Sequence, residues 1–384
     1  MKNKHAIGIF LMLSLLFAGC IKEDTEDCFS GLRLDFYFTL HTGKSNLFGE
    51  KVQQVHVYLF DENKVLRLYA VDNGNRLEYT YLQKDQMKTV TSPNAWGALP
   101  DNYVMNLDKV PAGKYRIISW AESNAGSRTS FFHGHMNNPA THDFSEGVTL
   151  GVTTMDDLYL FLQSVPAPSL PEDIVPEVDE IDDLWYGAVG TRHPEKSTYA
   201  VEEVVVKNGS VAERHIELIR NTNILKVTVS GMENIISAIG STPDNTPRQS
   251  EDNQLRLWAV ASNERYKCDN TIGEFARSIR YTPFHIDTDG QTLHADIKVL
   301  RLDMERPVLL YIETPDGRRI PSQPIDIVDK LRQARDPDTG EYVYNSQSDF
   351  DRIYEHPIEV RIGADMEIRI FIGEWEIVNV KPAE

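Results

Sequence analysis

Apolar and polar residues alternate along long stretches of the chain. In residues 31–40 (GLRLDFYFTL) every second position is apolar, and most positions between them are polar. Residues 52–60, 224–230 and 358–362 show the same pattern. A period of two places successive side chains on opposite faces of an extended backbone, so each run predicts a half-buried β-strand.

Short polar or Pro/Gly-containing segments separate these runs. Residues 61–64 (DENK) lie between two apolar runs and predict a hairpin, and residues 315–317 (PDG) predict a second tight turn. Helical periodicity is restricted to residues 155–162 and 232–239. Many strands with turns between them and few helices predict an all-β fold built from antiparallel β-sandwiches.

The length of 384 residues is enough for two such domains. We expect one domain over 31–212 and a second over 213–384. Residues 166–183 (PAPSLPEDIVPEVDEIDD) are rich in proline and carboxylates and predict a long loop within the first domain. Its acidic side chains are of the kind that bind calcium, and they are equally consistent with a solvated segment.

The N-terminus has the pattern of a secretory signal. Lys2 and Lys4 precede a run of apolar residues over 6–19, and Cys20 follows the small pair Ala18-Gly19. Fourteen residues are too few to span a bilayer, which takes about 20. We expect a signal peptide over 1–19 and a tether over 20–30.

Cys20 is the predicted lipidation site, because the preceding residues resemble the bacterial lipobox. The alternative is an ordinary signal peptide that is cut nearby. Residues 22–24 (Lys-Glu-Asp) resemble the export signal of Bacteroidota lipoproteins, which implies the outer face of the outer membrane. A plain polar tether is the other interpretation.

The charge of the chain excludes one class of partner. The full chain carries 39 basic and 58 acidic residues, and loss of the signal peptide with its two lysines leaves 37 − 58 = −21. A surface this acidic repels nucleic acid. Contact with the membrane should therefore come from lipid on Cys20.

Three cysteines are present, namely Cys20, Cys28 and Cys268. With Cys20 lipidated, Cys28 and Cys268 are left to form a disulfide in an oxidising compartment, or to remain as two separate buried thiols. The chain has no CxxC, so neither thiol-redox chemistry nor a cysteine-built zinc site is expected.

No catalytic motif is found, and we expect neither an enzyme nor a cofactor. The TGKS at 42–45 lacks the glycine that a phosphate-binding loop needs at position 38, which is Phe38. Residues 131–144 hold His133, His135, His142 and Asp143. Two histidines at alternate positions of a strand can share a metal, and an exposed loop is the competing interpretation.

Several segments, in this order, resemble the anchor lipoproteins of Bacteroidales fimbriae, of the minor fimbrium anchor type. They are Cys20, DCFSGLRLDFYF, VHVYLFDENKVL, VPAGKYRIISWAES, HIELIRNTNILKVTVSG and IRIFIGEWEIVNV. The resemblance implies two tandem transthyretin-like β-sandwich domains, no catalysis, and a lipid-anchored position in the outer membrane at the base of a fimbrium. It also implies a fimbrial stalk subunit as partner, joined by donation of a β-strand.

The resemblance gives the two ends of the chain distinct roles. Related stalk subunits are cut after an arginine near the N-terminus to vacate a groove. Here Arg33 lies inside the first predicted strand, so we expect residues 31–40 to stay in place and to end growth at the base.

Near the C-terminus, the alternation changes phase at Gly373, which predicts a bulge or a crossing between sheets. The flanking segment is either the last two strands of the chain's own sandwich or a segment donated to a neighbouring subunit. The residues that would make the subunit contact are Ile368, Ile370, Ile372, Trp375 and Ile377.

Two other functions stay open. A surface glycan-binding lipoprotein would need an exposed aromatic platform. Trp96 and Trp185 lie in loop-like sequence, whereas Trp120, Trp258 and Trp375 are expected to pack in cores. An adhesive tip subunit of the same fimbrial family is the other alternative.

Overall fold

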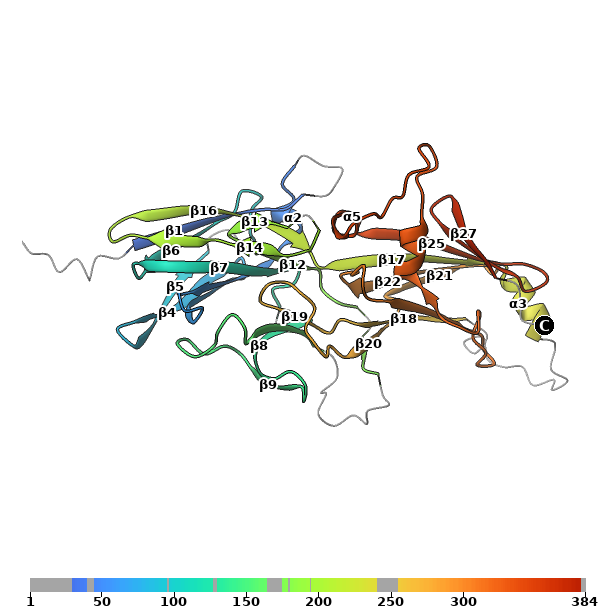
Figure 1. Ribbon diagram of the computed structural model, residues 1–384, viewed down its shortest axis with the longest axis horizontal. Coiled ribbons are helices and arrows are strands. Elements are labelled where there is room, and N and C mark those ends of the chain that lie inside the picture. The colour runs from blue at the N-terminus through green and yellow to red at the C-terminus, as the bar shows by residue number, and fades with distance from the viewer. Residues whose placement is uncertain are drawn as a thin grey trace, which may run out of the picture.

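The computed structural model describes residues 30–39, 45–94, 97–126, 130–163, 175–178, 180–193, 195–239 and 255–380. Strands far outnumber helices in this part of the chain, and two lobes follow one another along a single long axis (Figure 1). The predicted all-β fold is confirmed.

A ten-stranded sheet forms most of the first lobe. In chain order its strands are β1 (Ser30–Tyr37), β2 (Gln54–Phe60), β3 (Leu66–Asp72), β4 (Arg76–Gln83), β5 (Gln86–Pro93), β6 (Val104–Val110), β7 (Gly113–Glu122), β12 (Leu184–Ala188), β15 (Glu203–Val206) and β16 (Val211–Arg220). They lie in the order β5-β4-β3-β2-β7-β12-β16-β1-β6, and β15 pairs with β7. The lobe also contains helix α2 (Phe48–Lys51) and the small pair β13 (Gly190–Arg192) and β14 (Tyr199–Val201).

A four-stranded sheet covers one face of the ten-stranded sheet. Its strands are β8 (Phe131–Asn138), β9 (Asp143–Glu146), β10 (Leu158–Leu162) and β19 (Arg265–Lys267), in the order β19-β10-β8-β9. A hydrogen bond of 2.5 Å between Tyr58 Oη of β2 and His133 Nδ1 of β8 joins the two layers.

In the part of the chain that the structure describes, two sheets and three short helices build the second lobe. The six-stranded sheet has β21 (His285–Thr288), β22 (Thr292–Leu300), β17 (Thr222–Ser230), β25 (Glu355–Ile362), β26 (Ile368–Ile372) and β27 (Trp375–Val380), in that order. The five-stranded sheet has β11 (Glu177–Val178), β20 (Ser278–Tyr281), β18 (Arg256–Ser262), β23 (Val308–Glu313) and β24 (Ile325–Asp326), also in that order. The helices are α3 (Met232–Ile239), α4 (Ile327–Gln333) and α5 (Gln347–Arg352).

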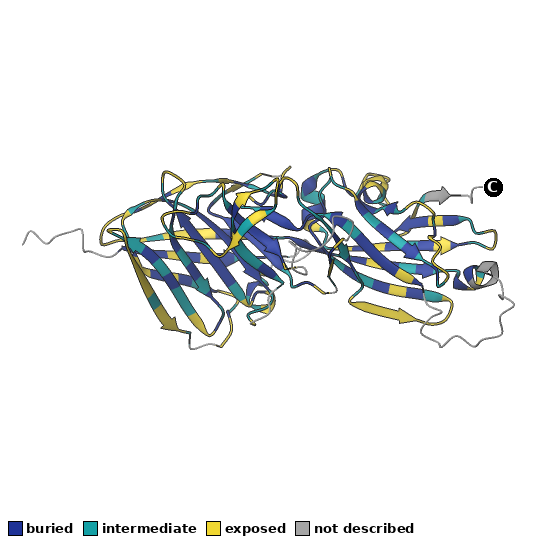
Figure 2. Cartoon of the chain, turned by 90° about the horizontal axis from the view of Figure 1, so that it is seen from below, coloured by how far each residue is buried: buried dark blue, intermediate teal, exposed yellow. Residues whose placement is uncertain are grey.

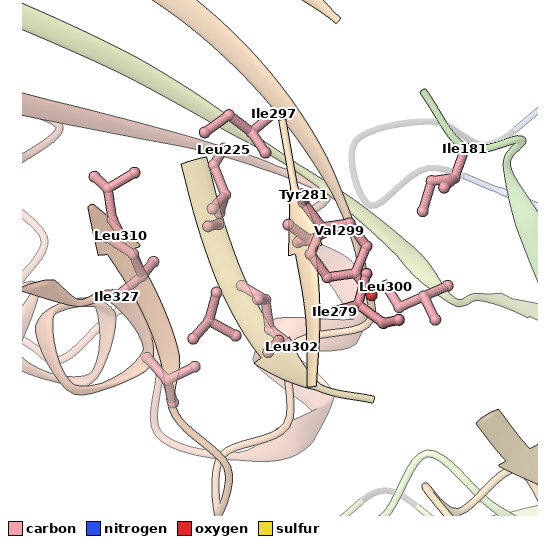
Figure 3. Packing of buried hydrophobic residues seen from close by; sticks show 14 of the residues in the cluster. Ile181, Leu225, Ile279, Tyr281, Ile297, Val299, Leu300, Leu302, Leu310 and Ile327 are labelled. Atoms are coloured by element: carbon pink, nitrogen blue, oxygen red, sulfur yellow. The ribbon is translucent and has the colours of Figure 1, made fainter. Parts of the chain in front are cut away.

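Two hydrophobic cores hold the lobes together. The first lies inside the ten-stranded sheet, which curls until β4 faces β6, and Tyr79 Oη of β4 donates a hydrogen bond of 2.5 Å to Asp108 of β6. The second runs from the other face of that sheet into the second lobe, where it fills the space between the two sheets (Figure 3). Buried and exposed positions alternate along most strands, as the period-two pattern predicts (Figure 2).

Among the described residues three strand pairs are parallel, which differs from the purely antiparallel sandwiches that we expected. They are β1 with β16, β17 with β25, and β11 with β20. Parallel neighbours need a long crossover connection. The chain provides one in each case, and most strands of the first lobe lie between β1 and β16.

Of the two helices that the sequence predicts, one is present and the other is a strand. Residues 232–239 form α3, as expected. The expected helix over 155–162 is wrong, because residues 158–162 form β10, in which all five side chains are buried. A strand that is covered on both faces has no polar positions to show its period, and its apolar run resembles a helix.

The two lobes exchange strands, so the sheets do not divide at a single point of the sequence. Residue 212 lies inside β16, and the chain leaves the first lobe at Asn221, between β16 and β17. Within 166–183, the described pair Glu177–Val178 joins the five-stranded sheet of the second lobe, while β19 joins the four-stranded sheet of the first.

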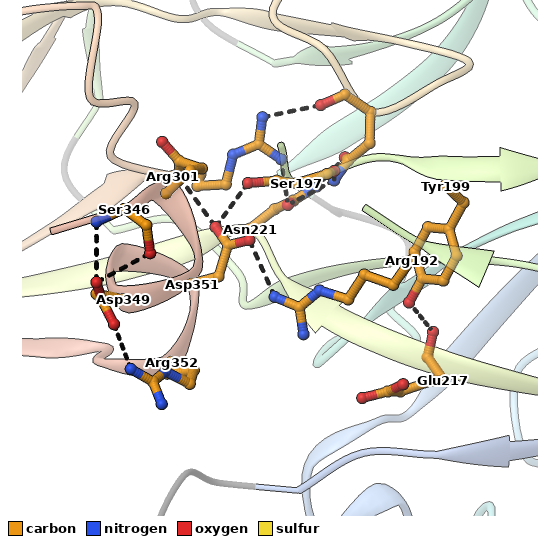
Figure 4. A network of polar contacts seen from close by, with 12 residues as sticks. Arg192, Ser197, Tyr199, Glu217, Asn221, Arg301, Ser346, Asp349, Asp351 and Arg352 are labelled. Carbon is orange, nitrogen blue, oxygen red and sulfur yellow. Dashed lines mark hydrogen bonds and ion pairs between the residues drawn. The ribbon is translucent and has the colours of Figure 1, made fainter. Parts of the chain in front are cut away.

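A buried polar network fixes the joint between the lobes, and Asn221 lies at its centre (Figure 4). The guanidinium of Arg301 donates to Asn221 Oδ1 at 3.1 Å and to the carbonyl of Asn270 at 2.8 Å. Asn221 Nδ2 donates to Asn270 Oδ1 at 2.6 Å. All three side chains are at most 4% exposed, so the joint is a packed interior and not a loose linker.

A second part of the network links α5 to the first lobe. Asp351 accepts hydrogen bonds from Ser197 Oγ at 2.6 Å and from Arg192 at 3.0 Å. Gln347 of the same helix donates to Asp351 at 3.0 Å. The Asp351 carboxylate is 3% exposed, and these bonds replace the water that it loses.

Candidate functional site

The last two strands form a hairpin at the edge of the second lobe. β26 and β27 pair in antiparallel fashion and are joined by Gly373 and Glu374. Gly373 has a φ of +60°, in the left-handed region that glycine adopts without a steric penalty. The predicted bulge or sheet crossing at Gly373 is therefore a tight turn.

A β-bulge lies close after this turn, within β27. Ile370 pairs with Val378 and Phe371 pairs with Glu376, so Ile377 is an extra residue without a partner opposite it. The extra residue lies beyond the phase change, which comes from the two-residue turn. Ile372 pairs with Trp375, so the positions on one face pass from even to odd numbers at Gly373.

The five residues expected at a subunit contact fall into two groups. Ile368, Ile370 and Ile372 point into the core of the chain's own second lobe and are 2–7% exposed. Trp375 is 37% exposed at the start of β27, and Ile377 is half-buried against the same core. The accessible part of the group is therefore on β27.

β27 is the outermost strand of its sheet. In the described part of the chain it pairs with β26 alone, which leaves one row of its backbone N–H and C=O groups unpaired by a strand. Glu374 in the preceding turn and Glu376 within β27 are both exposed. The opposite edge of the sheet is β21, whose four residues are all exposed, with Ile286 at 47%.

The first strand is an integral part of the first lobe. β1 lies between β16 and β6, and Leu32, Leu34 and Phe36 are at most 2% exposed in the enclosed core. Arg33 faces outward and forms an ion pair of 2.8 Å with Glu213 of β16. Its peptide bonds belong to a strand that is paired on both sides, and retention of this segment in the mature chain stays a prediction.

The cysteines and the tether are only partly described. Cys20, Cys28 and residues 22–24 lie outside the described residues. Cys268 is a buried free thiol whose backbone carbonyl accepts a hydrogen bond of 2.8 Å from Tyr186 Oη. Burial raises the pKa of this thiol well above its usual value, so it is a poor nucleophile.

The predicted disulfide between Cys28 and Cys268 stays a prediction, and the described geometry weighs against it. On β16, Val211 lies opposite Gly31 and Ile219 lies opposite Tyr186, so eight residues of strand separate the two regions. That is roughly 26 Å of strand. Cys28 lies two positions before Ser30, and two residue steps of chain span about 7 Å at most.

The four metal-ligand candidates of residues 131–144 separate in the structure. His133 points inward between the two layers of the first lobe, whereas Asp143 lies near Asn137 on the surface hairpin. His142 contacts Glu264 at 3.5 Å and Arg265 at 3.2 Å. The four candidates do not come together as one site. The competing interpretation of an exposed loop does not hold for residues 131–138, because they form β8.

The tryptophans give little support to an exposed aromatic platform. Trp120 and Trp185 are fully buried, so the expectation that Trp185 lies in a loop is wrong: it sits in β12 at the centre of a sheet. Trp375 was expected in a core and is partly exposed. Trp96 lies outside the described residues.

Trp258 is buried in a different manner from the core tryptophans. Its ring stacks on Tyr311 of β23, with 5.3 Å between ring centroids, and the Arg280 guanidinium lies 4.2 Å from the Trp258 ring centroid. The stack leaves the indole 7% exposed, so a sugar would have to displace Arg280 to reach it.

Comparisons with known proteins identify relatives by sequence and by fold. The family model of the fimbrillin-A associated anchor proteins Mfa1 and Mfa2 matches residues 25–381. No curated protein matches the chain. Among the helices that the structure describes, none has the length and apolar character that crossing a membrane requires.

Solved structures share this fold at low sequence identity. A proposed polysaccharide-binding protein from Bacteroides thetaiotaomicron has a TM-score of 0.60 and 19% identity, over 92% of this chain and 98% of that one. A proposed adhesin from Bacteroides ovatus has a TM-score of 0.59 and 17% identity, over 93% and 97%. The fimbrial anchor protein Mfa2 from Porphyromonas gingivalis has a TM-score of 0.55 and 18% identity, over 92% and 100%.

Proposed function

Because the chain belongs to the family of fimbrillin-A associated anchor proteins Mfa1 and Mfa2, we propose that it holds a fimbrium to the outer membrane and catalyses no reaction. In this proposal, lipid on Cys20 fixes the chain in the membrane, and the free edge of β27 receives a stalk subunit. Membership of the family places the chain at the cell surface in association with a fimbrium.

The observation that carries the proposal is the placement of the two ends of the described chain. β1 begins at the end of the first lobe that is remote from the second lobe, and the β26–β27 hairpin lies in the second lobe (Figure 1). A membrane attachment through the N-terminus and a subunit contact through β27 would therefore act at opposite ends of an elongated molecule. This is the geometry that an anchor between a membrane and a stalk needs.

Retention of β1 supports a second part of the proposal, that the chain ends fimbrial growth at the base. A subunit accepts a donated strand where a groove lacks one of its own strands. Here β1 fills its place between β6 and β16 with fully buried leucines. The first lobe therefore offers no vacant groove at β1, and a stalk subunit can add only at an exposed edge.

Deletion of the gene tests the proposal. We expect deletion cells to shed fimbriae into the medium, with longer filaments than wild type, because both the attachment and the growth stop are lost. Electron microscopy of cells and medium, with complementation by the wild-type chain, measures both effects. Unchanged fimbriae on deletion cells would contradict the anchor function, and a loss of glycan uptake instead would favour the surface glycan-binding alternative.

A substitution at the hairpin tests the proposed contact. Trp375→Ala should weaken capture of the stalk subunit at least tenfold, or about 1.4 kcal/mol, because exposed tryptophans that become buried are frequent binding hot spots. Surface plasmon resonance with the mature chain immobilised measures the affinity. Glu374→Gln, in the adjacent turn, is the matched control and should bind as wild type. Loss of binding in Ile286→Ala with full binding in Trp375→Ala would place the contact on β21.

A further inference from the structure

We propose that His56, Glu122 and His133 form a zinc-binding site between the two layers of the first lobe. The site does not depend on the proposed fimbrial function. Its ligands are two imidazole nitrogens and one carboxylate oxygen, a donor set that zinc takes up in proteins together with a fourth ligand.

The three side chains converge from three strands. His56 lies on β2, and Glu122 is the last residue of β7, where it pairs with Gln54 of β2. Both side chains therefore leave neighbouring positions on one face of the ten-stranded sheet. His133 lies on β8 of the covering sheet and points back at this face, so the ligands come from both layers.

The distances suit a tetrahedral ion. His56 Nε2 and His133 Nε2 each lie 3.6 Å from Glu122 Oε1, and the three ligand atoms lie within 4.8 Å of one another. Zinc bonds of about 2.0–2.1 Å at tetrahedral angles separate ligand atoms by about 3.4 Å. To reach this spacing, the two histidine–Glu122 distances must shorten by a few tenths of an ångström. The distance between the two imidazole nitrogens must shorten somewhat more.

Two tyrosines orient the imidazoles. Tyr69 Oη lies 2.7 Å from His56 Nδ1, and Tyr58 Oη lies 2.5 Å from His133 Nδ1. With each Nδ1 held by a phenol, both Nε2 atoms face the Glu122 carboxylate. Hydrogen bonding at the second ring nitrogen is the usual arrangement around a metal-binding histidine, because it fixes the tautomer and the ring direction.

Two polar atoms of the cluster lack a hydrogen-bond partner among the described residues. At 3.6 Å the histidine–glutamate contacts are too long for hydrogen bonds. Among the described residues, Glu122 Oε2 and His133 Nε2 have no hydrogen-bond partner, although Glu122 is 1% exposed. Unpaired polar atoms in a buried site cost free energy, which a bound cation would remove.

Burial disfavours a charge on each of the three side chains. It lowers the pKa of His56 and of His133 to about 3 and raises the pKa of Glu122 to about 7.

Gln54 is the candidate fourth ligand. Its carboxamide nitrogen lies 2.6 Å from His56 Nε2, and the side chain is half-buried at the rim of the site. A zinc ion on His56 Nε2 displaces this contact. The oxygen and nitrogen of an amide exchange places by a simple flip, which turns the oxygen toward the ion.

Zinc binding to the full mature chain tests the proposal. After removal of metal with a chelator, titration calorimetry with zinc chloride should show one equivalent bound with a dissociation constant below about 1 μM. Zinc at 100 times its dissociation constant should raise the melting temperature by roughly 5–10 °C. Cobalt(II) in place of zinc should give the visible absorption bands of a tetrahedral site.

Variants locate the site. Glu122→Gln and His133→Gln should each weaken zinc binding by roughly 100-fold or more, and His135→Gln, on the same strand but outside the cluster, is the matched control and should bind as wild type. Tyr69→Phe removes a single hydroxyl and should weaken binding by roughly 10- to 100-fold even if a ligand variant fails to fold.

Two results would overturn the proposal. One is the absence of zinc binding by the wild-type chain at micromolar concentration. The other is an equal loss of affinity in His135→Gln and His133→Gln, which would indicate adventitious binding that does not use this cluster.

Discussion

A chain with alanine in place of Cys20 should release most of its fimbriae from the cell. The mature chain carries a charge of 37 − 58 = −21, so no electrostatic attraction holds it to a membrane. A single acyl chain binds a bilayer only marginally and several acyl chains bind it firmly, each buried methylene contributing about 0.8 kcal/mol. Without them, we expect the fraction of fimbriae retained on cells to fall by roughly 100-fold.

This experiment separates attachment from export. The Cys20→Ala chain is expressed with an ordinary signal peptide, so that its export does not need the cysteine. Fimbrial antigen is then measured in the cells and in the medium. Cys268→Ala is the matched control, since that thiol is buried in the fold and should leave fimbriae on the cells. Full retention of fimbriae by Cys20→Ala cells would show that something other than lipid holds the chain.

Leu34→Asp should destabilise the first lobe by more than about 4 kcal/mol. Leu34 is fully buried in β1, between β16 and β6, within the enclosed core. The substitution removes about 2–3 kcal/mol of apolar burial and places a carboxyl group where no partner can reach it. Urea unfolding of the mature chain, followed by tryptophan fluorescence, measures the change.

Arg33→Gln is the control for this prediction. Arg33 is the neighbouring residue of β1 but faces solvent, and its ion pair with Glu213 joins side chains that are 50% and 68% exposed. Such pairs contribute between 0 and about 1 kcal/mol. If Leu34→Asp were as mild as Arg33→Gln, β1 would not be a structural strand, and the idea that it occupies its own groove would fail.

The sequence predicted the strands that have one solvent-exposed face and one buried face. The alternation in residues 31–40 located β1, and that of residues 358–362 located β25, because solvent on one side keeps every second position polar. It misread β10, which is buried on both sides. The same reason explains Trp185, which lies in a central strand although acidic residues precede it in the sequence.

Contacts between segments that are distant in the sequence could not be predicted from the sequence alone. His56, Glu122 and His133 share no motif, and only the register of β2 on β7 and the packing of β8 bring them together. Asn221 and Arg301 are likewise unremarkable in sequence, and their meeting at the joint depends on where β16 ends. The phase change near Gly373 was visible, but whether it meant a turn or a bulge depended on the pairing of β27.

The parallel pairing of β1 with β16 has a mechanical consequence. A membrane tether would pull on β1 at its N-terminal end, whereas β16 continues from its C-terminal end into the second lobe. In a parallel pair these two loads act lengthwise and in opposite directions, so the hydrogen bonds between the strands are sheared together and not opened one after another. β17 and β25 repeat the arrangement in the second lobe. A filament dragged by flow would thus load both lobes along the direction in which many bonds share the force.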